Sequence, residues 1–468
     1  MAPAAPAVEI VKVSRTVLED SEEPFSRRIY SYDIDTDPAG NLHLIYSKPV
    51  PGSNRCEIIY ATGPSPTHLV KTLLETDGKL GSVSTELLVT GINFVHVCYI
   101  KHQNDPDTHL VHQTISDGIP SEQQMVDGGG WHTKMQIKDN QAIFVRENGN
   151  ALLLLRPNPP GFSGWWGRFF APSGDIPYRL ADFTLASMYH VTYGDHADSH
   201  NGTPFHNLCY AFSQDTIVWQ PETIDSSTSL WEMEFWTSLV IDPAGNPILS
   251  TYRYAEYGGT YNTGTSLLLA RRNGTNWHRQ TIAGTIPGQT PPDHRAGMGG
   301  QLHIDDAGIL YGAWDNSPDY PIDFDGRYGN IVMDCCFGDS PWQSKTQIEP
   351  FSAEGYCRLA SHRTNLYMLV LGNYTDTKLY LIHLDSRRQW WRAATDLGNG
   401  WRRLNGFGLV HVASDPWIYH ADHGWMFSTS LSPDNLWFWT PDLGWLWTRE
   451  GTYPYLWSHE RESWLWYN

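Results

Sequence analysis

The sequence predicts an all-β fold: a seven-bladed β-propeller followed by a small C-terminal module of Trp-rich β-hairpins. A strand–turn–strand unit recurs along the chain, and its copies lie roughly 50 residues apart, close to the length of one propeller blade. No stretch shows helical periodicity. We expect the propeller at residues 20–400 and the hairpin module at residues 415–468. Six or eight blades remain alternatives, because the second to fourth units match the repeat only loosely.

The turn is the clearest part of the repeated unit. Asp37-Pro38-Ala39-Gly40-Asn41 returns letter for letter at 242–246, and a relaxed copy begins at Asp305. Apolar or alternating runs bounded by Gly, Pro, Asn and Asp flank the copies, as strands would. The run 152–155 is continuously apolar, which favours a strand buried on both faces. First strands are expected to begin near Tyr30, Ser82, His132, Leu180, Trp236, Arg295 and Tyr356.

Composition limits the partners and the location. The 468 residues include 32 Lys and Arg against 51 Asp and Glu, a formal charge of -19. Such a surface repels nucleic acid and anionic membranes, so we expect neither as a partner. No apolar run reaches the ~18 residues of a membrane-spanning helix. We expect a monomer that is secreted, periplasmic or on the cell surface; residues 1–6 lack an apolar signal core, so a cytoplasmic start is the alternative.

Six cysteines without regular spacing do not fix the compartment. Most fall in predicted strands, where buried free thiols are the simplest interpretation. A bridge between Cys336 and Cys357 is one alternative, and a zinc site on the adjacent pair at 335–336 is another, although it lacks the usual two-residue spacing. The aspartates within 319–325 could bind calcium. We expect no required cofactor and leave a structural calcium or zinc ion open.

The last 54 residues differ in kind. Nine of the 21 tryptophans lie between Trp417 and Trp466, and Gly-Trp recurs at 424–425 and 444–445. Alternating aromatics suit a pleated sheet, and the repeat resembles aromatic hairpin modules of some bacterial surface proteins. The preferred interpretation is a sheet that packs its aromatics on itself or on the propeller, because exposed rings would leave large apolar patches. The alternative is a sugar- or wall-binding appendage, since indole rings stack on pyranose rings.

Propeller geometry predicts the face that carries a site. The innermost strand of each blade crosses from one face to the other and the second strand returns, so first-strand starts and second-strand ends share one face. Binding groups concentrate on such loops and ends. The candidate catalytic residues there are His132, Tyr193, His196, His206, Arg253 and Tyr254. The candidate substrate-binding residues are Lys48, Arg146, Trp236, His294, Arg295 and Trp314.

The densest polar cluster spans 193–200 and 205–207, with three histidines and two carboxylates. It fits general acid–base catalysis, a metal site, or a solvated polar loop. His132 follows three glycines, which either let a ligand approach the backbone or form a tight connection between blades. Arg253 and Arg295 could hold a carboxylate through two parallel hydrogen bonds, or form salt bridges between blades.

The stretch 189–193, the polar loop after it and the stretch 206–213 resemble the BNR-like propellers that include ulvan lyases and rhamnose–glucuronate lyases. The Asp-x-x-Gly-Asn turns fit that group, and the resemblance covers the propeller only. It implies β-elimination on a uronic-acid-containing polysaccharide or oligosaccharide, with His and Tyr as base and acid and Arg neutralising the carboxylate. The matching positions are His132 or His206, Tyr193 or Tyr254, and Arg253. The Ser-x-Asp-x-Gly-x-Thr-Trp boxes of sialidases are absent.

Three functions therefore remain, and a polysaccharide lyase is preferred. A propeller glycoside hydrolase is the first alternative. An inverting one needs two carboxyl groups about 6.5–9.5 Å apart, and Asp195, Asp198, Glu256 and Asp315 are all expected on the same face. A glycan-binding protein without catalysis is the second alternative.

Overall fold

The computed structural model describes most of the chain, and all regular elements in that part are strands. The described residues are 7–20, 31–53, 55–79, 85–104, 107–128, 133–148, 151–158, 165–170, 178–197, 205–225, 237–254, 265–284, 295–296, 300–306, 308–317, 330–337, 346–349, 357–372, 378–389, 394–404, 406–414, 417–428, 436–449 and 451–466. Within these ranges no helix is long and apolar enough to cross a membrane.

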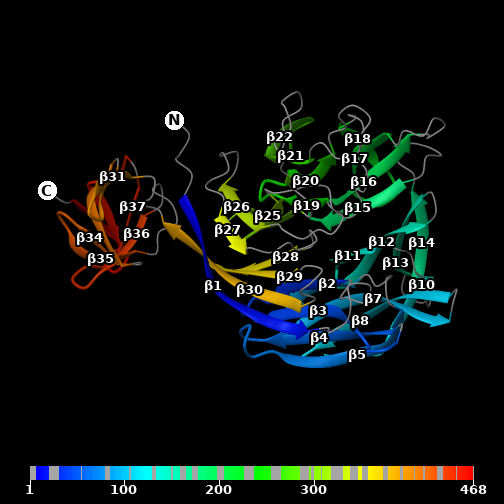
Figure 1. Cartoon of the computed structure of the whole chain (residues 1–468). Helices are drawn as coiled ribbons and strands as arrows, with labels where there is room; N and C mark the ends of the chain where they lie inside the picture. The colour runs from blue at the N-terminus through cyan, green and yellow to red at the C-terminus, as the bar shows by residue number, and fades with distance from the viewer. Residues whose placement is uncertain are drawn as a thin grey trace. The chain divides into compact units, whose positions relative to one another are not determined.

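Seven antiparallel blades form the propeller (Figure 1). The first blade contains β2 (Tyr32–Thr36), β3 (Leu42–Pro49), β4 (Arg55–Gly63) and β5 (Val70–Lys79). The second contains β6 (Thr85–Gly91), β7 (Phe94–Asn104), β8 (Asp107–Ser116) and β10 (Gln124–Gly128), with β9 (Ile119–Pro120) paired to β8. The third contains β11 (Thr133–Lys138), β12 (Gln141–Asn148), β13 (Ala151–Pro157) and β14 (Trp165–Phe170).

The fourth blade contains β15 (Tyr178–Leu185), β16 (Tyr189–Ala197), β17 (Phe205–Ser213) and β18 (Gln220–Asp225). The fifth contains β19 (Ser238–Ile241), β20 (Pro247–Tyr254), β21 (Thr265–Asn273) and β22 (Asn276–Gly284). The sixth contains β24 (Gln301–Ile304), β25 (Ile309–Ser317), β26 (Asn330–Phe337) and β27 (Thr346–Glu349), and the short β23 (Arg295–Ala296) joins β21 to β25. The seventh contains β28 (Cys357–His362), β29 (Asn365–Leu371), β30 (Lys378–Gln389) and β1 (Ala7–Asp20).

The first strands of the blades close a ring around the axis. Each contacts the next, from β2 through β6, β11, β15, β19 and β24 to β28, and β28 contacts β2 again. The predicted seven-bladed all-β fold is therefore confirmed. One predicted strand start is wrong: the innermost strand of the sixth blade begins at Gln301, and Arg295 belongs to the separate strand β23.

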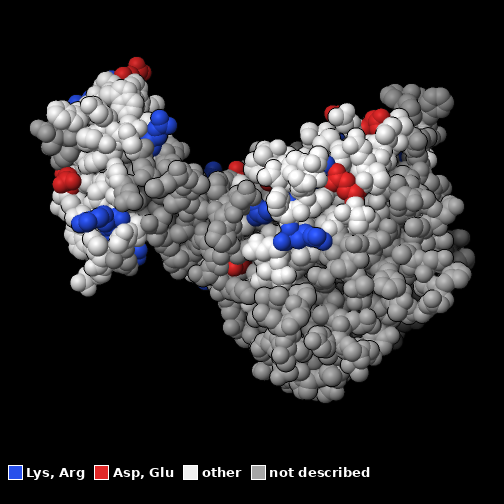
Figure 2. All heavy atoms as spheres, turned by 90° about the horizontal axis from the view of Figure 1, so that it is seen from above, with Lys and Arg blue, Asp and Glu red and all other residues white. Residues whose placement is uncertain are grey.

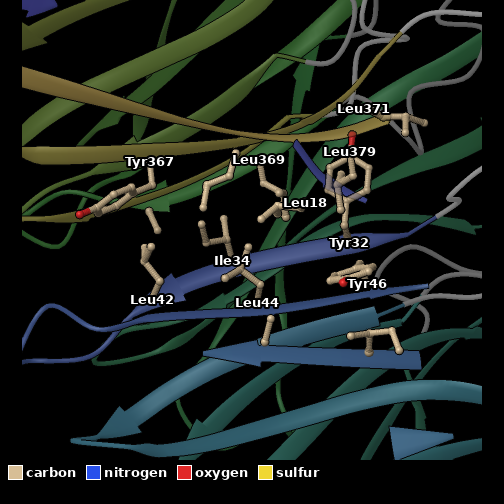
Figure 3. Close-up of a cluster of buried hydrophobic side chains, with 14 residues drawn as sticks. Leu18, Tyr32, Ile34, Leu42, Leu44, Tyr46, Tyr367, Leu369, Leu371 and Leu379 are labelled. Atoms are coloured by element: carbon tan, nitrogen blue, oxygen red, sulfur yellow. The ribbon is translucent and has the colours of Figure 1, made fainter. Parts of the chain in front are cut away.

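The closing blade combines the two ends of the propeller sequence. The N-terminal strand β1 is its outermost strand and pairs with β30. Leu18 of β1 is buried with Ile34 of β2 and Leu369 of β29 in one apolar cluster (Figure 3). Each large apolar side chain removed from water there contributes about 1.5–3 kcal/mol, so this cluster holds the first and last blades together.

Blade strands are buried on both faces, which explains their continuous apolar runs. Leu44 packs in the cluster shared with the last blade, whereas its neighbour Ile45 packs in the cluster shared with the second blade. In β13, Leu152 and Leu154 face the fourth blade while Leu153 and Leu155 face the second. Successive side chains of a strand point to opposite faces, so the apolar run at 152–155 fills two cores at once.

The repeated Asp turn is held by its first carboxylate. Asp37 Oδ1 accepts hydrogen bonds from the backbone N–H groups of Ala39 at 2.9 Å and Asn41 at 2.8 Å. Gly40 has φ +89° and Gly245, in the identical second copy, +88°, a left-handed conformation that glycine adopts at no steric cost. In both copies the turn residues thus specify the reversal locally.

The C-terminal strands form a separate nine-stranded antiparallel sheet in chain order. Its strands are β31 (Thr395–Gly398), β32 (Trp401–Leu404), β33 (Gly408–Ser414), β34 (Trp417–His420), β35 (Gly424–Ser428), β36 (Leu436–Thr440), β37 (Gly444–Thr448), β38 (Tyr455–Ser458) and β39 (Ser463–Trp466). The chain forms two compact units, Lys12–Asp334 with Lys345–Leu384, and Met1–Val11 with Cys335–Ser344 and Asp385–Asn468. The domain limits 20–400 and 415–468 stay predictions. In the structure, β1 begins before residue 20, at Ala7, and the C-terminal sheet begins at Thr395.

The C-terminal sheet buries its aliphatic face, not its tryptophans. Its fully buried core positions, which alternate along the strands, are Val410, Ile418, Met426, Phe438, Leu446 and Leu456. The intervening Trp and Tyr residues point the other way, and five aromatic rings in β34, β35, β38 and β39 are exposed. Tyr419, Trp425 and Trp464 also contact other rings of the sheet, so the preferred interpretation of packed aromatics holds for the five only in part.

All six cysteines are free and buried, as the simplest interpretation expected, so Cys336 and Cys357 form no bridge. No group of three or more His, Cys, Asp or Glu in the described ranges could hold a metal ion. The aspartates within 319–325 lie outside those ranges. On the face drawn in Figure 2, described Lys and Arg side chains lie among Asp and Glu without a continuous patch of either sign.

Candidate functional site at the propeller axis

A ring of polar side chains surrounds the propeller axis, and we call it the axial ring. Every innermost strand contributes one residue, which is the first or second of its strand except in β15, where it is the fifth. These residues are Asp33, Glu86, Lys134, Asp182, Ser238, Gln301 and Arg358. Since first strands start at the face predicted to carry the site, the axial ring lies toward that face.

Half of the axial ring is connected through Lys134. Its ammonium lies 2.9 Å from Glu86 Oε1 and 3.8 Å from Asp182 Oδ1. Asp182 Oδ2 in turn accepts a hydrogen bond from the backbone N–H of Leu239 at 2.7 Å, in the next blade. One lysine therefore joins the second, third and fourth blades, and one carboxylate continues the connection to the fifth.

Arg358 closes the other half. Ser238 Oγ accepts a hydrogen bond of 2.9 Å from Gln301 Nε2, and Arg358 NH1 donates one of 3.0 Å to Gln301 Oε1. Arg358 Nε lies 3.7 Å from Asp33 Oδ1. Asp33 Oδ2 accepts a hydrogen bond from the backbone N–H of Leu87 at 2.9 Å. These contacts and those of Lys134 connect all seven blades.

The charged members of the axial ring are 14–29% exposed, so solvent reaches them. Three carboxylates face two cations in the ring. Burial, together with the charge of Glu86, raises the pKa of Asp33 to about 7. Burial also opposes the charge of Lys134, but Glu86 and Asp182 outweigh it and raise the pKa of that ammonium. Shifted carboxyl groups occur at catalytic sites and in structural ion-pair networks.

A second set of titratable groups is buried beside the turns, away from the first-strand starts. His43 Nδ1 lies 2.6 Å from the Tyr60 hydroxyl, and His190 Nδ1 lies 2.6 Å from the Tyr210 hydroxyl. Burial lowers the pKa of His190 to about 4, so its imidazole is neutral at pH 7. Each pair joins two neighbouring strands within a single blade, the first blade for His43 and the fourth for His190. This position fits a structural role.

The predicted catalytic residues fall into three groups. His132 lies outside the described residues. For His196, His206, Arg253 and Tyr254 the structure describes the backbone. His196 at the end of β16 is directly opposite His206 at the start of β17. Tyr193 is buried in the apolar cluster between the third and fourth blades.

The predicted binding residues are likewise divided. Trp236 and His294 lie outside the described residues, while the backbone of Arg295 pairs with Thr265, the partner of Tyr254. Arg146 is buried, opposite Thr133.

Two further predicted binding residues make structural contacts. Trp314 is buried with Leu267 and Val332 between the fifth and sixth blades. Lys48 forms an ion pair of 2.8 Å with Glu19 of β1.

Sequence reasoning missed the axial ring, although a signal for four of its members was present. Four members follow the predicted strand starts at 132, 180, 236 and 356 by two positions: Lys134, Asp182, Ser238 and Arg358. Residues two apart share a face of a strand, so a strand start that faces the axis predicts an axis-facing residue two positions later. The ion pairs between blades were not predictable, because their members are distant in sequence.

No protein-family model matches the chain, and no curated protein matches it. Solved structures share a similar arrangement at low identity. One is an ulvan lyase of polysaccharide lyase family PL25, with 12% identity, a TM-score of 0.49, and coverage of 79% of this chain and 95% of that one. Another is the polysaccharide lyase Uly1, with 8% identity, a TM-score of 0.48, and coverage of 82% and 100%.

A third is an α-L-arabinanase from Penicillium chrysogenum, with 11% identity, a TM-score of 0.41, and coverage of 80% and 98%. These neighbours include both polysaccharide lyases and glycoside hydrolases. Likeness at this level does not assign an activity to this chain.

Proposed function

We propose that the protein is a polysaccharide lyase that cleaves a uronic-acid-containing glycan by β-elimination. One observation carries the proposal: the strand register gathers His, Tyr and Arg positions at neighbouring strand ends. His196 is opposite His206 in the fourth blade. In the fifth blade, Tyr254 pairs with Thr265, which also pairs with Arg295. All are second-strand ends or the strands paired with them, on adjoining blades.

The chemistry needs only these residue types. An arginine, Arg253 in this proposal, neutralises the uronate carboxylate and so makes the C5 proton more acidic. A histidine base removes that proton, and an acid, Tyr254 or Tyr193, protonates the leaving oxygen at C4. The C4–O bond breaks as the C4–C5 double bond forms, so neither a nucleophile nor an oxidant is needed. His206 is our preferred base because it lies opposite a second histidine, which can tune its pKa.

The axial ring supports this site. Lys134 and Arg358 are engaged with Glu86 and Asp33, so they hold the first strands in place. Fixed strands give fixed strand ends, and catalytic groups lose efficiency when displaced by even about 1 Å.

Absorbance in the unsaturated-uronate band tests the proposal. Purified protein is incubated with ulvan, rhamnogalacturonan and gum-type uronate polymers. The expected result is a rise in absorbance with at least one polymer that is much slower in both His206→Ala and Arg253→Ala. Flat traces with every polymer would reject the lyase.

A glycoside hydrolase is the second candidate, and one observation favours it. A carboxyl group whose pKa is raised to about 7, as for Asp33, is partly protonated at neutral pH and can act as a general acid. New reducing ends without unsaturated product, lost in Asp33→Asn, would select the hydrolase over the lyase.

We further propose that the protein acts as a secreted or surface monomer on polysaccharide, without a required cofactor and without nucleic acid or membrane partners. A structural calcium or zinc ion remains part of this proposal as an option. Sedimentation velocity and metal analysis of the purified protein test these points.

A further inference from the structure

The C-terminal sheet presents a continuous aromatic face to solvent. Five of its rings are between 37% and 64% exposed: Tyr419, Trp425, Tyr455, Trp464 and Trp466. The opposite face of the sheet is covered by the buried core residues. The five exposed rings are therefore not needed to fill that core. Large exposed apolar patches on soluble proteins mark interaction sites.

Strand register makes this face a ladder and not a scatter of single rings. Trp437 pairs with Trp447, Trp447 with Trp457, and Trp457 with Trp464. Tyr455 pairs with Trp466 at the sheet edge. A row of indoles thus runs across four successive strands, β36 to β39, perpendicular to the chain direction. We call this row, with Trp425, Tyr419, Tyr455 and Trp466, the aromatic face.

The rings meet their neighbours by their edges. Tyr419 and Trp425 have centroids 5.5 Å apart and planes at 76°, and Trp457 and Trp464 have centroids 5.6 Å apart at 70°. Edge-to-face pairs are stable by themselves. In each pair one ring presents its edge and the other one of its faces, so the edge-on ring keeps its own faces for a flat apolar ligand surface.

Charge favours an uncharged occupant. Strands β34 to β39 contain no Asp, Glu, Lys or Arg. Arg449, which follows β37, lies 5.9 Å from the centre of the Trp447 ring. At the left of Figure 2, the described surface of this unit is mostly uncharged. A single-stranded nucleic acid also stacks on aromatics but requires a cationic groove, which these strands lack.

Spacing favours a polymer with a short repeat. Neighbouring strands lie about 4.8 Å apart, so the ladder offers one indole per strand at that interval. This interval is close to the length of one sugar residue in an extended β-linked glycan. The apolar faces of pyranose rings can therefore stack on those indoles of the ladder that present a face, and the indole N–H groups can donate to sugar hydroxyls.

We propose that the aromatic face of the C-terminal sheet is a binding site for an extended, uncharged β-linked polysaccharide, built from other strands than those of the proposed catalytic residues. It holds the enzyme on polymeric material through stacking and takes no part in bond cleavage. The proposal does not depend on the lyase activity, because the residues involved lie outside the propeller.

Co-sedimentation of the full chain with insoluble cellulose and insoluble chitin tests the proposal. The wild-type chain is expected to bind at least one of them. The double variant Trp464→Ala/Trp466→Ala is expected to bind at least tenfold more weakly, because both rings lie on the edge strand β39 and are exposed. The matched control is Leu397→Ala, which removes an apolar side chain that is 50% exposed in β31, at the other edge of the sheet; its binding should equal that of the wild type.

A second variant separates binding from folding. Trp464→Tyr/Trp466→Tyr keeps two aromatic rings and should retain most of the affinity, with an unchanged melting temperature. Two results with the polymers would overturn the proposal: no binding of the wild type to either one, or equal binding of the double alanine variant. The proposal would also fail if the double alanine variant kept its polymer binding and lost only its association with phosphatidylcholine vesicles or with a second copy of the chain. Turnover on soluble oligosaccharides should be the same in all variants, so failure of this site and failure of the proposed activity are distinguishable.

Discussion

The propeller blades and the C-terminal sheet are both antiparallel meanders, yet they use their two faces differently. A blade strand such as β3 is buried on both sides, with Leu44 and Ile45 in different cores. A C-terminal strand such as β37 buries Leu446 while its tryptophans lie on the outer side. The blades also close into a ring around charged residues, whereas the C-terminal strands that carry the aromatic face hold no charge.

This difference shows that hydrophobicity alone does not say what a strand face is for. In a closed ring each blade covers the next, so every apolar side chain can be used for stability. In the nine-stranded sheet one face suffices for the core, and the larger, more polarisable aromatics are left on the other. We therefore associate the blades with rigidity and the aromatic face with binding.

The largest effect is expected from opening the ring. Deleting residues 1–20 removes β1 from the closing blade and exposes the cluster around Ile34 and Leu369. The loss should exceed the about 2–5 kcal/mol of a single core truncation and abolish cooperative unfolding of the propeller. Deleting residues 451–468 trims only the edge of the C-terminal sheet and should leave that transition intact. Urea unfolding followed by circular dichroism measures both; equal midpoints for the two deletions would break the comparison.

The charged axis should be nearly as sensitive. Lys134→Ala leaves Glu86 and Asp182 without their shared cation, and breaking such a pair costs about 3–5 kcal/mol. The control is Lys378→Ala, which removes an exposed ion pair with Asp20 and should cost about 0–1 kcal/mol. Free energies of unfolding from urea titration decide the matter. A similar small loss in both variants would mean that the axial ring contributes no rigidity.

Catalysis should depend on the propeller alone. His206→Ala should lower turnover by about 10²-fold or more, as loss of a base commonly does, with unchanged melting temperature. Arg253→Ala should weaken activity on uronate polymers, and Arg253→Lys should not fully restore it because lysine lacks the planar fork. Trp464→Ala in the C-terminal sheet should leave turnover on short oligosaccharides unchanged. Normal rates for His206→Ala would transfer the search for the base to His132 and His196.

The smallest effect is a pH response of opposite sign in the two regions. Burial raises the pKa of Asp33 to about 7, so the folded state holds a proton that the unfolded state has released. The contribution of Asp33 to the free energy of unfolding is therefore lost as pH rises from about 4 to 7. Burial beside His420 lowers the pKa of His423 from 6.5 to about 4. The contribution of His423 to the free energy of unfolding is therefore lost as pH falls through that range.

Paired variants measure these two contributions. Relative to the wild type, Asp33→Asn should gain stability with rising pH between about 4 and 7. His423→Gln should gain relative stability as pH falls from 6.5 toward about 4. Urea midpoints at several pH values give both differences, and parallel curves for either variant would contradict its assigned titration.

The sequence by itself determined the elements whose causes are local. The turn at Asp37 is built by its own carboxylate and by Gly40 within five residues, so its second copy at Asp242 could be recognised from the letters. The continuous run at 152–155 predicted a doubly buried strand for the same reason, since strand alternation places neighbouring side chains on opposite faces. The strand-end histidines were identified by position, and register alone set His206 against His196.

Only the tertiary structure decided which distant groups meet. Lys134 could not be assigned to Glu86 and Asp182 in advance, because ring closure, not sequence proximity, brings their strands together. The partner of β1 is β30, from the far end of the propeller. In the C-terminal sheet, alternation showed that Leu446 and Trp447 face opposite ways but not which of them faces inward. That choice depends on the shape of the space that the whole sheet encloses, and the closely packed aliphatic side chains fill it.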